Sequence, residues 1–450
     1  MTVRAGLKAC TTSGRDLGAC ATRPVVVQAF RPAVIVLALL LFRPSIALAQ
    51  APTPSERVTF DEAIRRAVEK NPTVVAAATG ILRAEGLIRQ ARAATRLQVG
   101  GNVTTTTLNT GVDFQGSVVT PQNQVTASLT ADMPIVAAAA WARKAQAEDT
   151  KTVSQLALAD TRRQIAFATA DAYLTIIASR RVVESTTRSR DVAKVHFDFA
   201  TELEQKGSGS RLNALRAQQQ YSIDDGLVEV ARLSLYRAQE ALGVLIVSDG
   251  PVDAVDEPAF DLPPDTTGSL TAFRTDLKLF AGQEQAAEHV FRDSSKDWWP
   301  TLDAIFQPST TYPSQFFLPA NSWRLLLQAN VPIFDSGQRA GTKLLRQADV
   351  EERRATLSGG VTRANSEVRA AREAIASGER SLASARASAD QAQQVVQITN
   401  VSFRAGAATN IEVIDAERTA RDADFLVAQA EDNLRRARLD LLTALGRFPG

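Results

Sequence analysis

Few side chains of this sequence could carry out chemistry. It holds only two histidines, His196 and His289, which lie in different halves of the chain, and no cysteine follows Cys20. A metal cage or a thiol nucleophile needs several such residues close together. No glycine-rich phosphate loop follows an expected strand. We therefore expect no catalytic, cofactor-binding or metal-binding residues and no enzymatic activity, and we interpret each histidine as a structural or surface residue.

One acidic pair near the C-terminus has a spacing that is compatible with a functional site. Glu412 and Asp415 are three residues apart, which puts both carboxylates on one face of a helix. The pair lies shortly after Gly406, where a turn is expected. Acidic residues also favour the first turn of any helix because of its dipole. On the residues alone, an ordinary helix start is the preferred interpretation, and a ring of carboxylates from several copies is the alternative.

The composition favours a helical scaffold or conduit over an enzyme. The 450 residues carry 51 basic and 49 acidic side chains, so a strongly basic nucleic-acid-binding protein is excluded and no nucleic-acid partner is expected. A single core seldom exceeds about 250–300 residues, which indicates two units or an elongated molecule. Ala, Arg, Gln, Glu and Ser dominate the middle and the end of the chain, and most of these residues favour helices.

The N-terminus reads as an export signal. An apolar run of 11 residues, 32–42, follows Arg31 and is too short to span a membrane as a helix. A small-x-small cleavage pattern ends at Ala49, so we expect a signal peptide over 1–49 and a mature chain that starts at Gln50. The alternative is a buried helix or a short anchor. An exported chain of this kind is periplasmic, secreted or located in the outer membrane.

The chain is an internal duplication. Residues 124–135 match 322–333 at an offset of 198, and each half ends in Ala-Leu-Gly. Each half has the same expected order of helix, two strands, very long helix, glycine turn and long helix. The predicted boundaries are a first repeat at 50–248, a linker rich in Asp and Pro at 249–268, and a second repeat at 269–450.

The long helices are predicted to form coiled-coil hairpins. The segment 135–206 contains neither Gly nor Pro, and 333–404 is its counterpart in the second half. A second helix is expected to run back from each, over 211–246 and 410–445. Every seventh residue of the last helix is apolar, and the positions three residues later are all alanine. The first of these rows is Val413, Ala420, Val427, Leu434 and Leu441. Such a seven-residue repeat is typical of helices that supercoil around each other.

Four segments alternate like membrane strands. Apolar and polar residues alternate over 124–133 and 322–331, and partner strands are expected near 97–107 and 301–307. This pattern suits strands with one face toward outer-membrane lipid and one toward a lumen, although a half-buried soluble sheet is the alternative. Trp298 and Trp299, at a strand entrance, would belong to an aromatic girdle at the membrane interface. Four strands cannot close a barrel, so three chains with twelve strands are the preferred assembly.

Three segments resemble the TolC-type outer-membrane efflux protein family. They are 58–64 with the sequence VTFDEAI, 331–337 with VPIFDSG, and 403–416 with the glycine turn followed by IEVIDA. The resemblance implies a mainly helical fold with strands, in which a homotrimer builds a shared 12-stranded barrel and a periplasmic helical tunnel. It also implies an exit duct that docks onto a periplasmic adaptor (membrane fusion) protein and an inner-membrane efflux pump or ABC transporter. The alternative is a periplasmic or secreted coiled-coil scaffold without a pore.

The same resemblance assigns roles to particular residues. It implies that Glu412 and Asp415 line a periplasmic gate, which reverses the preference stated above. It also implies that the two hairpin tips contact the adaptor. The tip residues are Gly207, Ser208 and Gly209 in the first half and Ala405, Gly406 and Ala407 in the second. The sequence departs from the family at Ala408, where some members carry an arginine that latches the closed state.

Overall fold

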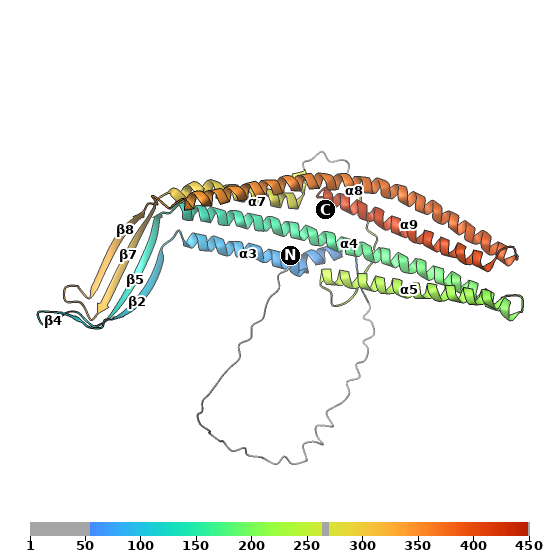
Figure 1. Cartoon of the computed structure of the whole chain (residues 1–450), viewed down its shortest axis with the longest axis horizontal. Helices are drawn as coiled ribbons and strands as arrows, with labels where there is room; N and C mark the ends of the chain where they lie inside the picture. Colours follow the sequence, from blue (N-terminus) through green and yellow to red (C-terminus); the bar gives the residue numbers. More distant parts are fainter. Residues whose placement is uncertain (1–54, 263–269, 449–450) are drawn as a thin grey trace, which may run out of the picture. The chain divides into compact units, whose positions relative to one another are not determined.

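Two long helical hairpins and a four-stranded sheet make up most of the described chain (Figure 1). The computed structural model describes residues 55–262 and 270–448, and these lie in one unit, Pro54–Gly450. The predicted signal peptide, 1–49, lies outside the described residues. Within the unit, the sheet lies at one end and the hairpin turns lie at the other.

The helical hairpins are those that the sequence predicts. Their helices are α4 (Ala138–Gln205) with α5 (Arg211–Ile246), and α8 (Gln338–Arg404) with α9 (Asn410–Ala444). Each hairpin turns at a glycine with a left-handed backbone, Gly207 with a φ of 73° and Gly406 with a φ of 76°. Glycine adopts this conformation at little cost because it has no Cβ. The predicted duplicated, mainly helical fold is confirmed.

Both long helices begin later than the predicted residues 135 and 333. In the first half, strand β5 (Asn123–Val136) continues through Pro134 and takes the residues expected to start the helix. In the second half, the carboxylate of Asp335 accepts hydrogen bonds from the backbone N–H groups of Gly337 (3.1 Å) and Arg339 (3.0 Å). A side chain that satisfies these N–H groups fixes the start of α8 after the turn.

The predicted heptad rows lie between α8 and α9. One cluster joins leucines of α9 to β-branched residues of α8, and a second consists of alanines from both helices. The first holds Val368, Ile375, Leu434 and Leu441, and the second holds Ala389, Ala392, Ala420 and Ala423. Small side chains in the second cluster allow the two helix backbones to approach closely near the turn. The sequence pattern therefore identified the contact surface of this hairpin.

The main sheet is antiparallel and has the order β2-β5-β7-β8. Its other members are β2 (Gln98–Thr107), β7 (Thr301–Tyr312) and β8 (Asn321–Asn330). The central pair, β5 and β7, joins the two halves of the chain, and β2 and β8 form the two edges. All four predicted strands are confirmed. A further hairpin of β3 (Val112–Phe114) and β4 (Ser117–Thr120) extends the β2–β5 connection.

A compact core lies where the helices of the two halves meet. It contains Phe60, Tyr173, Leu242 and Leu439 and is covered by a short parallel pair, β1 (Glu56–Val58) and β6 (Val252–Ala254). Strand β6 thus lies inside the segment predicted as a linker. The remaining elements are α2 (Phe60–Lys70), α3 (Pro72–Ala93), α6 (Leu270–Phe273), α7 (Thr275–Arg292) and the 3₁₀ helix η1 (Asp293–Trp298).

Candidate functional site

The sheet has one mainly polar and one mainly apolar face. Residues directly opposite each other on neighbouring strands share a face. On one face, the hydroxyls of Thr126 and Thr311 are 3.2 Å apart, and Arg324 donates to the side-chain oxygen of Gln307 at 2.8 Å. On the other face, the rings of Phe306 and Trp323 contact each other with centroids 6.1 Å apart. This arrangement confirms the predicted alternation and suits a sheet between water and lipid.

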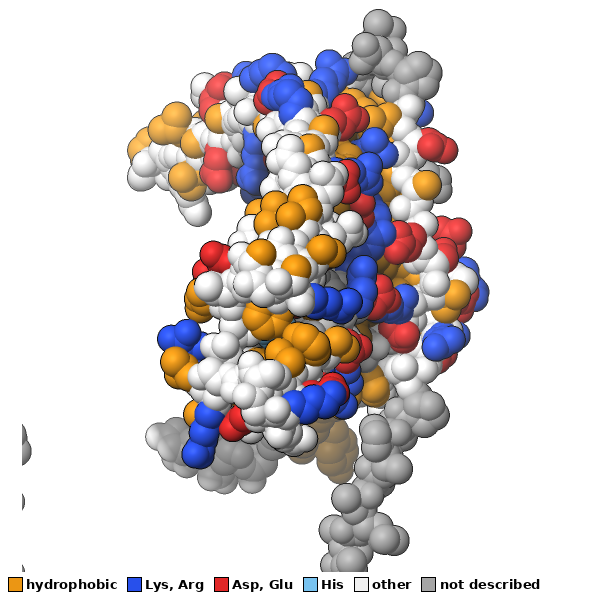
Figure 2. All heavy atoms as spheres, turned by 90° about the vertical axis from the view of Figure 1, so that its right-hand side faces the viewer, with side chains coloured by type: hydrophobic (Ala, Val, Ile, Leu, Met, Phe, Trp, Pro, Cys, Tyr) orange, Lys and Arg blue, Asp and Glu red, His pale blue; other side chains and the backbone are white. Residues whose placement is uncertain are grey.

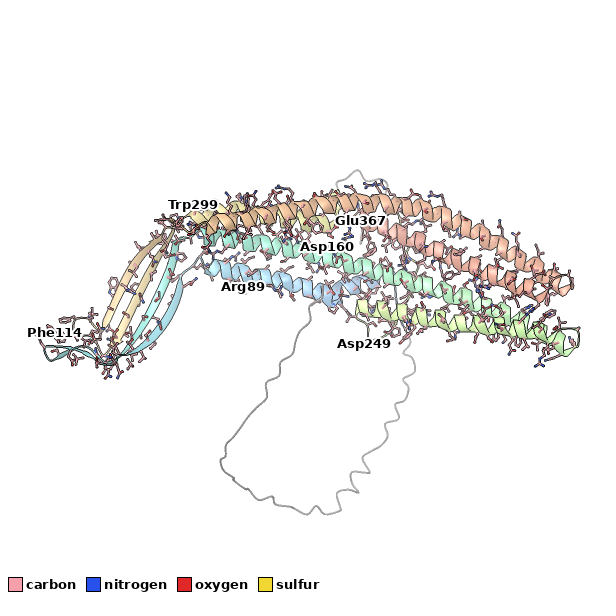
Figure 3. The ribbon with its side chains drawn as sticks, viewed as in Figure 1. Arg89, Phe114, Asp160, Asp249, Trp299 and Glu367 are labelled. Atoms are coloured by element: carbon pink, nitrogen blue, oxygen red, sulfur yellow. The ribbon has the colours of Figure 1, made fainter. Side chains whose placement is uncertain are left out.

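The aromatic pair Trp298 and Trp299 lies where the sheet meets the helices (Figure 3). Their exposed fractions are 49% and 57%. The guanidinium of Arg339, on α8, lies 4.2 Å from the ring centre of Trp298, a distance typical of a cation–π contact. Phe114, on β3, lies beyond the opposite end of the sheet in the same view. The two tryptophans therefore mark the helical end of the sheet.

The two hairpin turns are held side by side by polar contacts. The side-chain amide of Asn410, at the start of α9, donates to the backbone oxygen of Asn213 on α5 at 3.2 Å. The Nε2 atom of His196, on α4, donates to the side-chain oxygen of Asn410 at 2.5 Å. His196 is buried, and its desolvation lowers the pKa of the imidazole although the bond to Asn410 acts in the opposite direction. The structural role expected for this histidine is confirmed.

The other histidine also has a structural partner. His289, on α7, contacts the carboxylate of Asp149 on α4 at 2.9 Å. Within residues 55–262 and 270–448, no group of three or more His, Cys, Asp or Glu side chains is placed to hold a metal ion. In the same two segments, no helix combines the length and the apolar character needed to cross a membrane.

The acidic pair lies on an exposed face of α9. Both Glu412 and Asp415 are exposed. The carboxylate of Glu412 accepts a hydrogen bond from the backbone N–H of Thr409 at 2.8 Å, and the Thr409 side chain completes a capping box. Glu412 therefore stabilises the start of the helix, as the simpler interpretation of the sequence held. Asp415 takes no part in this cap and adds a second charge to the same face.

Figure 2 looks at the end of the unit that carries the hairpin turns. Acidic and basic side chains are mixed there and lie beside apolar groups. The exposed apolar residues of this region include Val195, Leu212, Ile398, Val401 and Ile411. The surface is therefore amphipathic, and no single charge sign dominates it.

A half-buried carboxyl group between the two hairpins was not anticipated from the sequence. Glu417, on α9, lines a cavity of about 410 Å³ together with Asp224 of α5 and Arg188 of α4. Burial raises the pKa of Glu417 to about 7, and the nearby charge of Asp224 acts in the same direction. Arg421 binds Asp224 at 2.7 Å. The available sequence signal was the position of Glu417 four residues after Val413, beside the heptad row.

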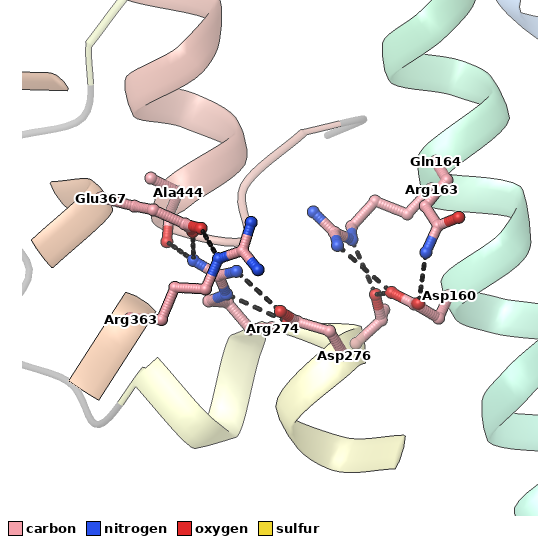
Figure 4. A network of polar contacts seen from close by, with 9 residues as sticks. Asp160, Arg163, Gln164, Arg274, Asp276, Arg363, Glu367 and Ala444 are labelled. Atoms are coloured by element: carbon pink, nitrogen blue, oxygen red, sulfur yellow. Dashed lines mark hydrogen bonds and ion pairs between the residues drawn. The ribbon is translucent and has the colours of Figure 1, made fainter. Parts of the chain in front are cut away.

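A second polar network joins the helices near the middle of the unit (Figure 4). Arg274, at the start of α7, is buried and donates two hydrogen bonds to Asp276, at 3.0 and 2.6 Å. It also binds Glu367 of α8 at 2.7 Å and the backbone oxygen of Ala444 of α9 at 3.3 Å. Burial opposes ionisation of Asp276, but its hydrogen bonds with Arg274 outweigh that effect and lower its pKa. The network ties three helices together.

The first half makes a related contact. The side-chain amide of Asn71, just before α3, donates to the backbone oxygen of Leu245 near the end of α5 at 2.9 Å. Arg274 contacts the end of α9 in the second half in the same way. Each repeat therefore uses one polar side chain between its short and returning helices. The duplication extends from element order to the contacts that position the helices.

Comparison with known proteins decides what this architecture represents. The family described as outer membrane efflux protein matches residues 63–246 and 270–447, one segment in each half of the chain. The chain belongs to the outer membrane efflux protein family. The family's description agrees with a location in the outer membrane. The matched segments coincide with the two repeats of the fold.

Individual relatives agree with this assignment. Outer membrane protein OprJ of Pseudomonas aeruginosa is 26% identical over 245 residues, which cover 49% of this chain and 50% of OprJ. The match thus spans about half the length of that curated relative. The structure of VceC from Vibrio cholerae superimposes with a TM-score of 0.73 at 17% identity and covers 86% of this chain and 96% of VceC.

The channel CmeC from Campylobacter jejuni gives a similar result. It has a TM-score of 0.76 at 14% identity and covers 86% of this chain and 85% of CmeC. At these identities, the structural likenesses establish the fold. The predicted resemblance to the TolC-type family and the outer-membrane location are confirmed.

Proposed function

We propose that three copies of this chain form one channel that carries substrates out across the outer membrane. The observation that supports this assembly is the two-faced sheet with β2 and β8 at its edges. Backbone groups left unpaired in lipid cost several kcal/mol each, so an open edge is not stable there. If β8 of one copy pairs with β2 of the next, three copies of a four-stranded sheet close a barrel of twelve strands.

The helical hairpins would extend this barrel into a periplasmic tunnel. We propose that the tips at 207–209 and 405–407 contact a periplasmic adaptor protein, and that an inner-membrane efflux pump or ABC transporter supplies the energy. The amphipathic surface around the tips suits a protein partner. The chain itself would catalyse no reaction. Trp298 and Trp299 would lie at the periplasmic interface of the membrane, where indole rings are enriched.

We propose that Asp415 and Glu412 form the charged lining of the periplasmic entrance. Both carboxylates are exposed on one face of α9 beside the turn, so three copies would bring six of them to one end of the tunnel. A ring of acidic side chains attracts cations. The mature chain, starting at Gln50, and the boundaries 50–248, 249–268 and 269–450 remain predictions.

A variant without the two charges distinguishes a role in the gate from a role in capping the helix. In Glu412→Gln with Asp415→Asn, the side-chain amide of Gln at position 412 still fits the capping box, so the helix start is retained. In planar bilayers, the variant trimer should lose much of its preference for cations and its block by multivalent cations. An unchanged cation preference and block would mean that these carboxylates only start a helix.

A further inference from the structure

The four strands of the main sheet, all of which the structure describes, carry three charged side chains. They are Asp132 on β5, Asp303 on β7 and Arg324 on β8. All three lie on the mainly polar face, where Arg324 contacts Gln307. Asp303 is four residues from Gln307 on the same strand, and Asp132 lies opposite Ile305, two residues from Gln307. Even steps along a strand stay on one face.

The positive and negative charges lie at different levels of the sheet. Arg324 lies opposite Gln307, and Asp303 is closer to Trp299 by four residues, or about 13 Å along the strand. Asp132 is two strands and two residues away from Arg324, at a distance of about 12 Å. At physiological ionic strength, charges are screened over about 8 Å. The carboxylates therefore cancel little of the field around the arginine.

The guanidinium of Arg324 is held in place by a neutral partner. Its Nε and Nη2 atoms both donate to the side-chain oxygen of Gln307, at 2.8 and 2.5 Å. Among the described residues, no carboxylate forms an ion pair with it. Arg324 is also exposed. Gln307 therefore positions the side chain without neutralising its charge, and the Nη1 group remains available to a solute.

We propose that Arg324 is a contact point in the barrel lumen for the anionic groups of exported solutes, such as carboxylates and sulfonates. This inference rests on the proposed channel, in which the mainly apolar face meets lipid and the mainly polar face lines the lumen. Hydrogen bonds between a guanidinium and an anionic oxygen are stronger than those between neutral groups. The proposed entrance is acidic and favours cations, so the three arginines of a trimer give part of the barrel the opposite preference.

A reporter thiol measures the charge of the lumen beside Arg324. The chain has only Cys10 and Cys20, and both lie within the predicted signal peptide, so an introduced cysteine is the only thiol of the mature chain. Ser322 is two residues from Arg324 on the same face, and its hydroxyl lies 3.0 Å from that of Ser309. In Ser322→Cys, the rates of reaction with an anionic and a cationic methanethiosulfonate of similar size are compared. The assembled protein is reconstituted in lipid vesicles for this measurement.

Removal of the guanidinium charge should lower the ratio of the anionic to the cationic rate. The reporter would lie about 7 Å from the charge, so Arg324→Gln should lower the ratio about twofold at 0.15 M salt and about fivefold at 0.01 M. Arg324→Lys keeps the charge and should keep the ratio. A second reporter, Thr130→Cys, is two residues from Asp132 on the same face. There, Asp132→Asn should raise the ratio.

Two outcomes would contradict the proposal in different ways. If Ser322→Cys reacts but Arg324→Gln leaves its ratio unchanged in a conducting trimer, the anion contact fails and the proposed channel stands. Leu325→Cys places the thiol on the mainly apolar face and should react with neither charged reagent. If Leu325→Cys reacts and Ser322→Cys does not, the mainly polar face does not line the lumen, and the proposed channel fails as well.

Discussion

Replacement of Glu417 by Gln should stabilise the protein at alkaline pH and leave its stability unchanged at acidic pH. The carboxyl group lies between the α4–α5 and α8–α9 hairpins, and it shares its cavity with Asp191 and Asp224 as well as Arg188 and Arg421. Arg421 is engaged by Asp224. Ionisation of Glu417 therefore places a charge in a partly desolvated site, next to the negative charge of Asp224. Glutamine has nearly the same shape without that charge.

The size of the effect follows from the pKa. In the folded chain, the pKa of Glu417 rises from 4.5 to about 7. The folded state binds this proton more tightly than the unfolded state, so stability is highest below pH 4.5 and falls as the pH rises toward 7. At about 1.36 kcal/mol for each pH unit, ionised Glu417 costs the folded chain about 3 kcal/mol at pH 8.

The assay is thermal unfolding followed by far-UV circular dichroism at several pH values in detergent. The Glu417→Gln protein should melt at a higher temperature than the parent at pH 8, and the two should converge near pH 4.5. Glu184→Gln, at an exposed position of α4, serves as the control and should follow the parent at every pH. Parallel curves for Glu417→Gln and the parent would refute the argument, since they would show no coupling of this carboxyl group to folding.

Three further variants test the packing of the unit, and denaturant unfolding measures each one. Ala430→Leu places a large side chain at a buried position of α9 and should destabilise by about 1–3 kcal/mol; unchanged stability would mean that this row is not packed. Tyr173→Phe removes the hydroxyl that binds Asp256 in the core and should cost about 1–3 kcal/mol, whereas a neutral result would mean that this bond adds nothing. Arg274→Ala leaves Asp276 without its buried partner and should cost about 3 kcal/mol, so a loss below 1 kcal/mol would contradict the role given to this network.

Much of the helical architecture could be predicted because its signals are local and periodic. The seven-residue rows that contain Leu434 and Leu441 report directly on the packing of α9 against α8. The glycines at 207 and 406 mark turns that few other residues allow. The first residues of α4 and α8 were harder to predict. Strand β5 continues through Pro134 and delays the start of α4, and the hydrogen bonds accepted by Asp335 fix the start of α8 after a turn.

The central core and the buried charges could not be predicted in the same way. Strands β1 and β6 are each three residues long, which is too short to show an alternation of apolar and polar residues. They also pair across almost 200 residues of sequence. Glu417 looks like one of many charged residues on a long helix, and it is partly desolvated only because the two hairpins pack against each other around it. Arg274 gains two of its three partners, Glu367 and the backbone oxygen of Ala444, from elements that are distant in sequence. These features depend on tertiary contacts that a single sequence does not display.

The number of chains in the assembly extracted from outer membranes tests the central claim most directly. Native mass spectrometry of the full-length protein, released gently from detergent, counts the copies. Because β2 and β8 are the open edges of a four-stranded sheet, we expect complexes of three chains that separate only on denaturation. A folded single chain as the main species would contradict the shared barrel and, with it, the proposed channel.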